Sequence, residues 1–182
     1  MRERRRTCCF TGHRPEKLPW GSNERDPRCS ALKATIRDAV AAAYDEGFRH
    51  FICGMARGCD FYFAEAVLAL RQEHPELTLE AAIPCPTQSR AWPAEERERW
   101  QSLIDASDYE TLVQERYSPD CMIRRNRYMV DHSGLVIAVY GGTDGGTRRT
   151  LEYAIAKKVP FLDIHPRGDI QKFCRLSDEG EV

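Results

Sequence analysis

The chain has 182 residues, of which 42% are hydrophobic and 30% charged, and its formal net charge is −1. These values are typical of one globular domain and exclude the overall basic field of a strong nucleic-acid binder. No apolar run approaches the ~20 residues of a membrane span, and the run at 7–10 is too short for a signal peptide. We expect a cytoplasmic protein with a single domain over 1–182, in which 1–6 and 166–182 are peripheral.

The eight cysteines contain no Cys-x-x-Cys pair, and no His-x-x-x-His pattern accompanies them. Zinc sites and small disulfide scaffolds depend on such spacings. Several of these cysteines lie within apolar strand patterns, where a reduced thiol packs as a small hydrophobic group. We therefore expect reduced, structural thiols, with no metal site and no resident cofactor.

The first half of the chain alternates strand and helix patterns. A β-prone run at 7–11 ends at Gly12, and a long loop, 12–27, follows. This loop is rich in Pro and Gly, but Leu18 and Trp20 would be unusual in a disordered segment, so we expect it to be ordered. Hydrophobic periodicity then predicts a helix at 30–46, a strand at 48–53, a helix at 61–72 and a strand at 77–83.

The second half continues the alternation. It predicts a helix at 93–106, strands at 109–113, 135–140 and 160–164, and helices at 121–132 and from about 147. The run at 135–140 is continuously apolar, as in a strand buried on both faces. The alternation predicts a Rossmann-like, doubly wound α/β fold, with a mostly parallel sheet and helices on both faces.

A glycine-rich turn joins the strand at 135–140 to the next helix. It contains Gly141, Gly142, Gly145 and Gly146 and reaches the helix at Thr147. Such a turn places bare backbone N–H groups and the positive end of a helix dipole at one point, which suits a phosphate. It matches neither the Gly-x-Gly-x-x-Gly fingerprint nor a Walker A loop. A tight turn without a ligand is the alternative interpretation.

Residues after the first strand provide a second part of the predicted site. Gly12, His13 and Arg14 follow this strand directly. Arg14 could hold an anion, and His13 could donate a hydrogen bond to it. The alternative is a surface arginine beside a turn histidine.

The loop after the second strand contains Gly54, Arg57, Gly58 and Asp60. Its glycines allow a ligand to approach the backbone, with the charged side chain of Arg57 over it. Asp60 either contacts a ribose hydroxyl or caps the following helix. Because ligands of such sheets bind at the carboxyl ends of the strands, we expect these loops to converge on one site.

The helix at 121–132 carries Arg124, Arg125, Asn126 and Arg127. These arginines span a wide angular range, so at most one or two can face the site, and we assign Arg125 and Asn126 to it. Trp92 either stacks on a base or serves as simple packing.

Three segments carry a family resemblance: Thr-Gly-His-Arg-Pro at 11–15, Gly-Met-Ala-Arg-Gly-Cys-Asp at 54–60 and Arg-Asn-Arg-Tyr-Met-Val-Asp at 125–131. The chain resembles the SLOG superfamily of Rossmann-like proteins, and within it the YpsA-like group, over 11–164. This resemblance implies a nucleotide or nucleotide-derived ligand in the predicted site.

Two related groups suggest different activities. Residues 54–60 are similar to the equivalent loop of DprA, which binds single-stranded DNA. Residues 122–147 are similar to the LOG-type nucleoside-monophosphate phosphoribohydrolases, whose helix arginine matches Arg125. In that group a catalytic glutamate stands where this chain has Thr150, and Glu152 follows two residues later. The LOG-type resemblance also implies a homodimer.

We expect a protein that binds or senses a nucleotide-like small molecule. The alternative is an N-glycosidase in which Asp60, Glu65 or Asp144 replaces the missing glutamate, since a carboxylate stabilises the oxocarbenium-like state of such reactions. A weaker alternative is a single-stranded DNA accessory protein. The net charge makes nucleic acid an unexpected partner, and we expect no membrane partner.

Overall fold

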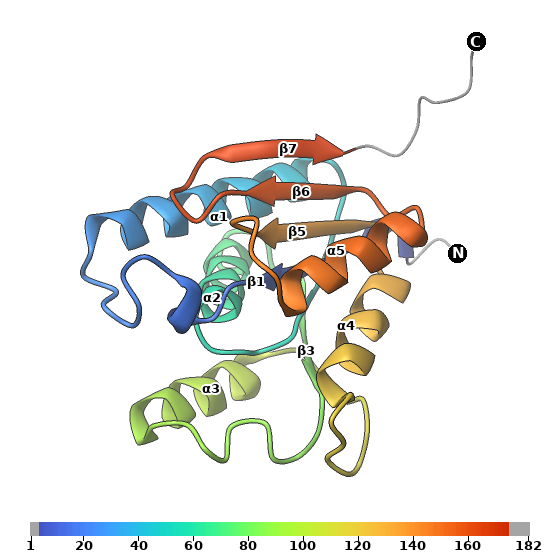
Figure 1. The fold of residues 1–182 in the computed structure, drawn as a ribbon. Coiled ribbons are helices and arrows are strands. Elements are labelled where there is room, and N and C mark those ends of the chain that lie inside the picture. The colour runs from blue at the N-terminus through green and yellow to red at the C-terminus, as the bar shows by residue number, and fades with distance from the viewer. Residues whose placement is uncertain (1–3, 175–182) are drawn as a thin grey trace.

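The computed structural model describes residues 4–174, which form a seven-stranded sheet with helices on both faces (Figure 1). The strands and helices, in chain order, are β1 (Thr7–Gly12), α1 (Pro27–Asp45), β2 (His50–Cys53), α2 (Cys59–Arg71), β3 (Thr78–Ile83), α3 (Ala94–Ala106), β4 (Tyr109–Leu112), α4 (Cys121–Asp131), β5 (Leu135–Val139), α5 (Gly146–Ala156), β6 (Phe161–Ile164) and β7 (Ile170–Cys174). Two 3₁₀ turns, η1 (Arg4–Arg6) and η2 (Pro15–Lys17), flank β1.

The strand order is β4-β3-β2-β1-β5-β6-β7, and the first six strands in this order are parallel. From β1 the chain builds the sheet outward to β4, and it then returns to place β5 on the other side of β1. The strand order therefore reverses between β1 and β5. The predicted Rossmann-like fold is confirmed, and its switch point lies where ligands of such sheets bind.

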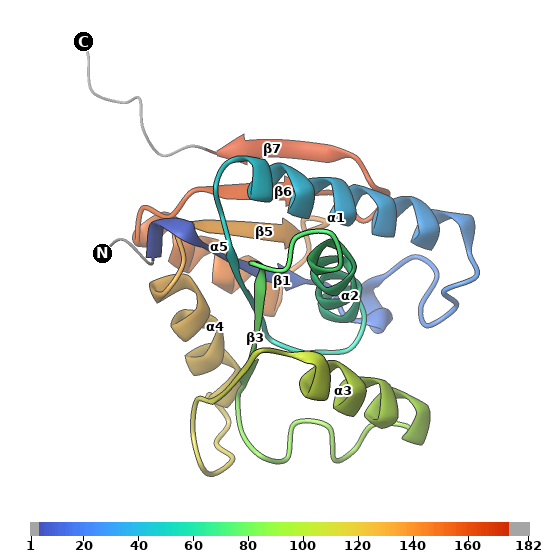
Figure 2. The ribbon, with the colours of Figure 1, turned by 180° about the vertical axis from the view of Figure 1, so that it is seen from behind.

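The two faces of the sheet have separate apolar cores. α1, α2 and α3 pack over one face, around Phe10, Phe51 and Ile137 (Figure 2). α4 and α5 pack over the other face, around Cys9 and Val136. Successive residues of β1 and β5 alternate between the two cores, because side chains of a strand point to opposite faces. This explains the continuous apolar run of β5, all of which is buried.

The loop at 12–27 is ordered, as expected. Leu18 and Trp20 are buried in the core, and η2 lies within the loop. α1 starts earlier than the periodicity predicts, because Pro27 occupies its first position and Asp26 caps it by accepting the Arg28 N–H at 2.9 Å.

The segment from 166 onward contributes more than the sequence predicts. Residues 170–174 form β7, which pairs antiparallel with β6 and extends the sheet. The remainder of this segment, 175–182, lies outside the described residues, as do 1–3. None of the helices within 4–174 is long and apolar enough to cross a membrane. The cysteines from Cys8 to Cys121 are all free and buried, as expected.

Candidate functional site

A cavity of about 300 Å³ lies at the switch point. Its walls come from the end of β1, the loop after it, the β2–α2 loop, α4 and the start of α5. It brings together the predicted site residues Gly12, His13, Arg14, Asp60, Arg125, Asn126, Gly146 and Thr147. The predicted residues that do not line it are Gly54, Arg57, Gly58, Gly141, Gly142 and Gly145.

Arg125 and Asp60 form the buried, charged part of this cavity, and each is only 4% exposed. The guanidinium of Arg125 donates to the carbonyl oxygens of Gly54 and Ala82 through Nη1 and to Asn126 Oδ1 through Nε. Asp60 Oδ2 accepts the Ala56 N–H at 3.0 Å. Burial raises the pKa of the Asp60 carboxyl, and the nearby charge of Arg125 lowers it in part. Asp60 is therefore not a simple N-cap, because Gly58 occupies that position.

The glycines of the loops after β1 and β2 allow close packing around the cavity. A Cβ on Gly54 would overlap the Arg125 guanidinium. Gly58 has a φ of 83°, and a Cβ there would lie 2.9 Å from the carbonyl oxygen of His13. A Cβ on Gly12 would lie 2.6 Å from that of Cys59, so Gly12 lets α2 approach β1. The glycines of these loops are thus explained by close packing.

The turn that the sequence predicts as an anion cradle leads into the start of α5. Its N-cap, Gly145, has a φ of 150° and ψ of −163°, and no side chain caps the helix. No N-cap side chain therefore accepts a hydrogen bond from the first backbone N–H groups of α5. Lys17, from η2, places its ammonium over Gly145 and donates to the carbonyl oxygen of Asp144. Lys17 also lines the cavity and is a site residue that the sequence did not reveal.

His13 links the two loops that flank the cavity. It is 3% exposed, and its Nε2 accepts the Gly141 N–H at 3.0 Å. Burial, with the nearby charges of Lys17 and His165, lowers the pKa of His13 to about 4. The ring is therefore neutral at pH 7, with its proton on Nδ1. The sequence predicted a donor to an anion, but Nε2 is an acceptor that holds the glycine-rich turn.

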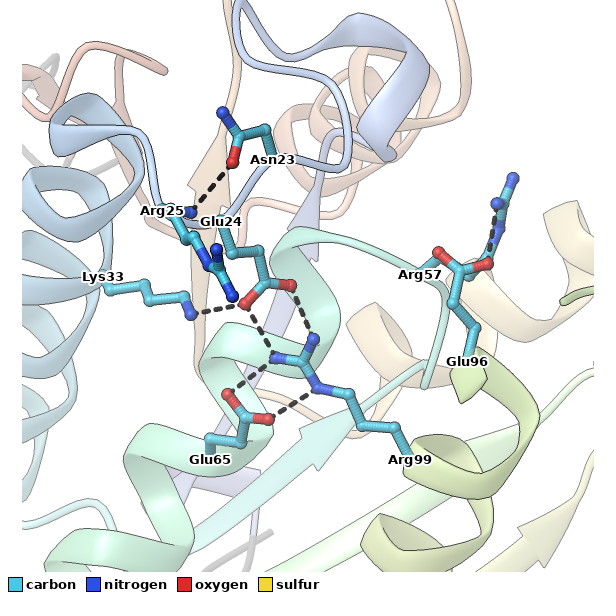
Figure 3. Close-up of polar contacts among 8 residues, drawn as sticks. All are labelled: Asn23, Glu24, Arg25, Lys33, Arg57, Glu65, Glu96 and Arg99. Carbon is cyan, nitrogen blue, oxygen red and sulfur yellow. Dashed lines mark hydrogen bonds and ion pairs between the residues drawn. The ribbon is translucent and has the colours of Figure 1, made fainter. Parts of the chain in front are cut away.

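The arginines differ in their availability. Arg14 is exposed at the rim of the cavity and makes no ion pair within 4–174. Arg57 does not line the cavity. Its guanidinium pairs with Glu96 at 2.9 Å (Figure 3) and also with Glu16. Arg124 pairs with Asp120 at the surface. Of the predicted cationic residues, Arg14 and Arg125 remain in the site.

An ionic network holds the 12–27 loop in place. Arg99 of α3 lies between Glu24 of this loop and Glu65 of α2, at 2.5 and 2.8 Å (Figure 3). Lys33 of α1 reaches the same Glu24 at 2.6 Å. Three helices thereby fix the loop that supplies one wall of the cavity. Trp92 packs edge-on against Phe61.

Of the carboxylates considered as replacements for the missing glutamate, Asp60 alone lines the cavity. Glu65 is engaged by Arg99, and Asp144 pairs with Arg148 at the surface. Glu152 also pairs with Arg148. The Thr150 hydroxyl is buried and donates to the Gly146 carbonyl oxygen at 2.8 Å, which makes it part of the helix start.

Comparisons with known proteins identify a family and two relatives. The sequence model of the YspA SLOG family (YpsA) matches residues 8–161. The chain is 33% identical, over 135 residues, to the uncharacterized SPbeta prophage-derived protein YoqJ of Bacillus subtilis (strain 168), covering 68% of this chain and 77% of that protein. It is 24% identical, over 162 residues, to a UPF0398 protein of Bacillus thuringiensis (strain Al Hakam), covering 88% of each.

Two solved structures share the fold. DNA processing protein A (DprA) from Streptococcus pneumoniae superimposes with a TM-score of 0.58 at 14% identity, and the match covers 88% of this chain but 50% of that one. DNA processing protein A from Helicobacter pylori, described for its single-stranded DNA binding mode, superimposes with a TM-score of 0.56 at 18% identity, over 87% of this chain and 64% of that one. This chain thus spans half to two thirds of those chains.

Proposed function

This chain belongs to the YspA SLOG family, and we propose that its switch-point cavity binds a nucleotide or a nucleotide-derived small molecule. The observation that carries the proposal is the convergence, in one cavity, of an uncapped helix start, cationic side chains and a buried carboxylate. The cavity volume, about 300 Å³, lies at the lower end of the range for small-molecule sites. A mononucleotide is of suitable size.

The phosphate is expected at the start of α5. Backbone N–H groups of Gly146 and Thr147 point out of an N-terminus that no side chain caps. The ammonium of Lys17 lies beside the same point, and Arg14 lines the cavity without an ion pair within 4–174. Charge-assisted hydrogen bonds of this kind contribute roughly 1.5–3 kcal/mol each.

Asp60 is the expected partner of a sugar hydroxyl. Its Oδ2 accepts the Ala56 N–H, whereas its Oδ1 makes no hydrogen bond within the described residues. A ribose hydroxyl can donate to this oxygen, and Arg125 keeps the carboxylate charge favourable beneath it. A ligand without such a hydroxyl would displace water from this oxygen and leave it unpaired, which gives selectivity for ligands that carry the hydroxyl.

Calorimetry against AMP, ADP-ribose, NAD and cyclic nucleotides tests the proposal. We expect micromolar to millimolar binding of at least one of them, weakened about tenfold or more by Arg14→Ala. Arg25→Ala is the matched control, because Arg25 is exposed in the same loop, does not line the cavity and makes no ion pair within 4–174. Folded protein that binds none of these ligands at millimolar concentration would refute the proposal.

The likeness to a single-stranded DNA-binding protein favours one other candidate, a site for single-stranded DNA. Given this likeness, the expectation that nucleic acid is not a partner has no support. The same cavity would then hold one nucleotide of a strand, and Arg14 would contact its phosphate. A gel shift with an oligonucleotide at low salt tests this candidate. An affinity for the oligonucleotide that exceeds the affinity for AMP, and that Arg14→Ala abolishes, would favour it.

The N-glycosidase alternative now depends on Asp60. Its raised pKa and its place in the cavity are typical of a catalytic carboxyl group. Incubation of the protein with each nucleoside monophosphate, followed by chromatography, tests it. Release of free base that Asp60→Asn abolishes would support this activity, and intact substrates would exclude it.

A further inference from the structure

A second cavity, of about 830 Å³, lies at the opposite edge of the sheet, where the strands begin. Its walls come from η1, from the first residues of β2, β3 and β4, and from the last turn of α4. It does not share a lining residue with the switch-point cavity. Of the three family segments, only the one at 125–131 reaches this cavity, through Tyr128 and Asp131.

The rim of this second cavity carries two arginines from η1 that are held in place but not neutralised. Arg4 Nε donates to the Ser133 carbonyl oxygen at 3.1 Å, and Arg6 Nε donates to the Gly47 carbonyl oxygen at 3.3 Å. Within 4–174, no carboxylate lies within ion-pair distance of either guanidinium. The terminal Nη groups therefore remain available, and a guanidinium fork matches the oxygens of a phosphate.

The ends of two helices account for the position of these arginines, but hydrogen bonds to carbonyl oxygens there do not neutralise the guanidinium charge. Gly47 follows the end of α1, and Ser133 follows the end of α4. The carbonyl ends of helices are negative, and a guanidinium there is favourable. Each arginine satisfies one carbonyl oxygen through Nε and keeps its remaining donors. The helix ends thus orient the two guanidinium groups before any ligand is present.

The interior of the second cavity is polar and internally satisfied. Glu80 is 7% exposed, and it accepts hydrogen bonds from Tyr128 at 2.6 Å and Thr111 at 2.7 Å. Its other oxygen lies 2.7 Å from His50 Nε2. Although burial raises the pKa of Glu80, these hydrogen bonds hold it at about 2. The carboxylate is therefore ionised, and three donors offset its charge.

The other acidic residues of the walls are engaged as well. Glu76 accepts the hydroxyl of Tyr44, and Asp131 accepts that of Tyr153. Lys157 also lies 3.6 Å from Asp131. The acidic groups thus have partners, while the two cationic groups of the rim have no anionic partner within 4–174.

An aromatic ring stands at the same cavity. Tyr109, the first residue of β4, is 56% exposed. It contacts the ring of His50 edge-on, at 5.7 Å between centroids and 74° between planes. Tyr109 lines the same cavity as Arg4 and Arg6. An exposed aromatic ring and cationic groups in one site are the combination that holds the base and the phosphate of a nucleotide.

We propose that the second cavity is a separate binding site for a phosphate-bearing small molecule with a planar ring, of the nucleotide type. Arg4 and Arg6 hold the phosphate, and the ring lies on Tyr109. This site is independent of the switch-point cavity. It gives the protein two ligand sites, one at each edge of the sheet.

Calorimetric titration of the full chain with ADP at low salt tests the inference. The titration uses an Arg14→Ala background, in which the switch-point cavity binds weakly. Failure of the second site can then be told apart from failure of the switch-point site. We expect the remaining binding to weaken about tenfold or more in Arg4→Ala/Arg6→Ala and several-fold in Tyr109→Ala. Arg5→Ala is the matched control, because Arg5 lies in the same turn but does not line the cavity.

The control should retain the affinity of the background. Thermal unfolding verifies that each variant is folded, and Tyr109→Ala provides a test that does not depend on the helix ends. An equal loss in Arg5→Ala would mean that the charge of the turn acts without a site and would overturn the inference. So would unchanged binding in both test variants, binding of an oligonucleotide in place of ADP, or no ADP binding at millimolar concentration.

Discussion

Acidification should destabilise this protein through His13. The ring is buried and neutral, and its Nε2 accepts the Gly141 N–H. Its pKa is about 4 in the folded protein, against an ordinary value near 6.5. Between these two values the unfolded chain binds a proton that the folded protein does not. Stability should therefore fall as the pH is lowered from 6.5 to 4, and this contribution should be constant outside that window.

The size of the effect follows from the gap between the two pKa values. At ~1.4 kcal/mol per pH unit, the gap corresponds to about 3 kcal/mol at most. Part of the depression comes from the charges of Lys17 and His165, which are less buried than His13 and are screened by salt. At physiological ionic strength we expect about 2 kcal/mol.

Urea unfolding at pH 7, 5.5 and 4 measures this contribution. The reference is His13→Gln, because a glutamine side-chain oxygen can accept the Gly141 N–H and does not titrate. The carboxylates that the two proteins share, Glu80 among them, contribute equally and cancel in the difference. The free energy of unfolding of the wild type should fall by about 2 kcal/mol more than that of the variant. Parallel profiles, within about 0.5 kcal/mol, would refute the reasoning.

Three further predictions concern the supports of the switch-point cavity. Arg125→Met should lower the free energy of unfolding in urea by roughly 3–5 kcal/mol, because it leaves Asp60 buried without its cation. Adding Asp60→Asn to this variant should recover part of the loss. No recovery would show that Arg125 and Asp60 are not energetically coupled. Gly54→Ala should cost about 2 kcal/mol or more on the same assay, since its Cβ would displace Arg125; a neutral effect would contradict this. Arg99→Ala should weaken AMP binding several-fold by releasing the loop, whereas Arg97→Ala, exposed on the same helix, should leave the affinity of folded protein unchanged.

The fold could be predicted because its signals are local. β5 is one continuous apolar run, and such a run is typical of a strand that is buried on both faces. Alternation of strands and helices then forces a parallel sheet, and this places the loops after β1, β2 and β5 at one edge. The convergence of Arg14, Asp60 and Thr147 on one cavity followed from that geometry rather than from any single motif.

What the sequence did not reveal depends on contacts between distant segments. Arg57 looked like a ligand residue, but it pairs with Glu96 of α3, whose position no local pattern encodes. Lys17 lies in a loop without periodicity, and only the folded path of η2 places it over Gly145. The strand β7 lies in a polar segment and depends on β6 for its pairing. The second cavity lies at the edge where no glycine-rich loop marks a site.

The central claim is that the start of α5 holds the phosphate of a nucleotide. Titration of isotopically labelled protein with AMP, followed through backbone amide resonances, tests it most directly. The account predicts the largest shifts at Gly145, Gly146 and Thr147, with the same shifts requiring about tenfold more AMP in Arg14→Ala. Shifts confined to other parts of the chain, or no shifts at millimolar AMP, would contradict it.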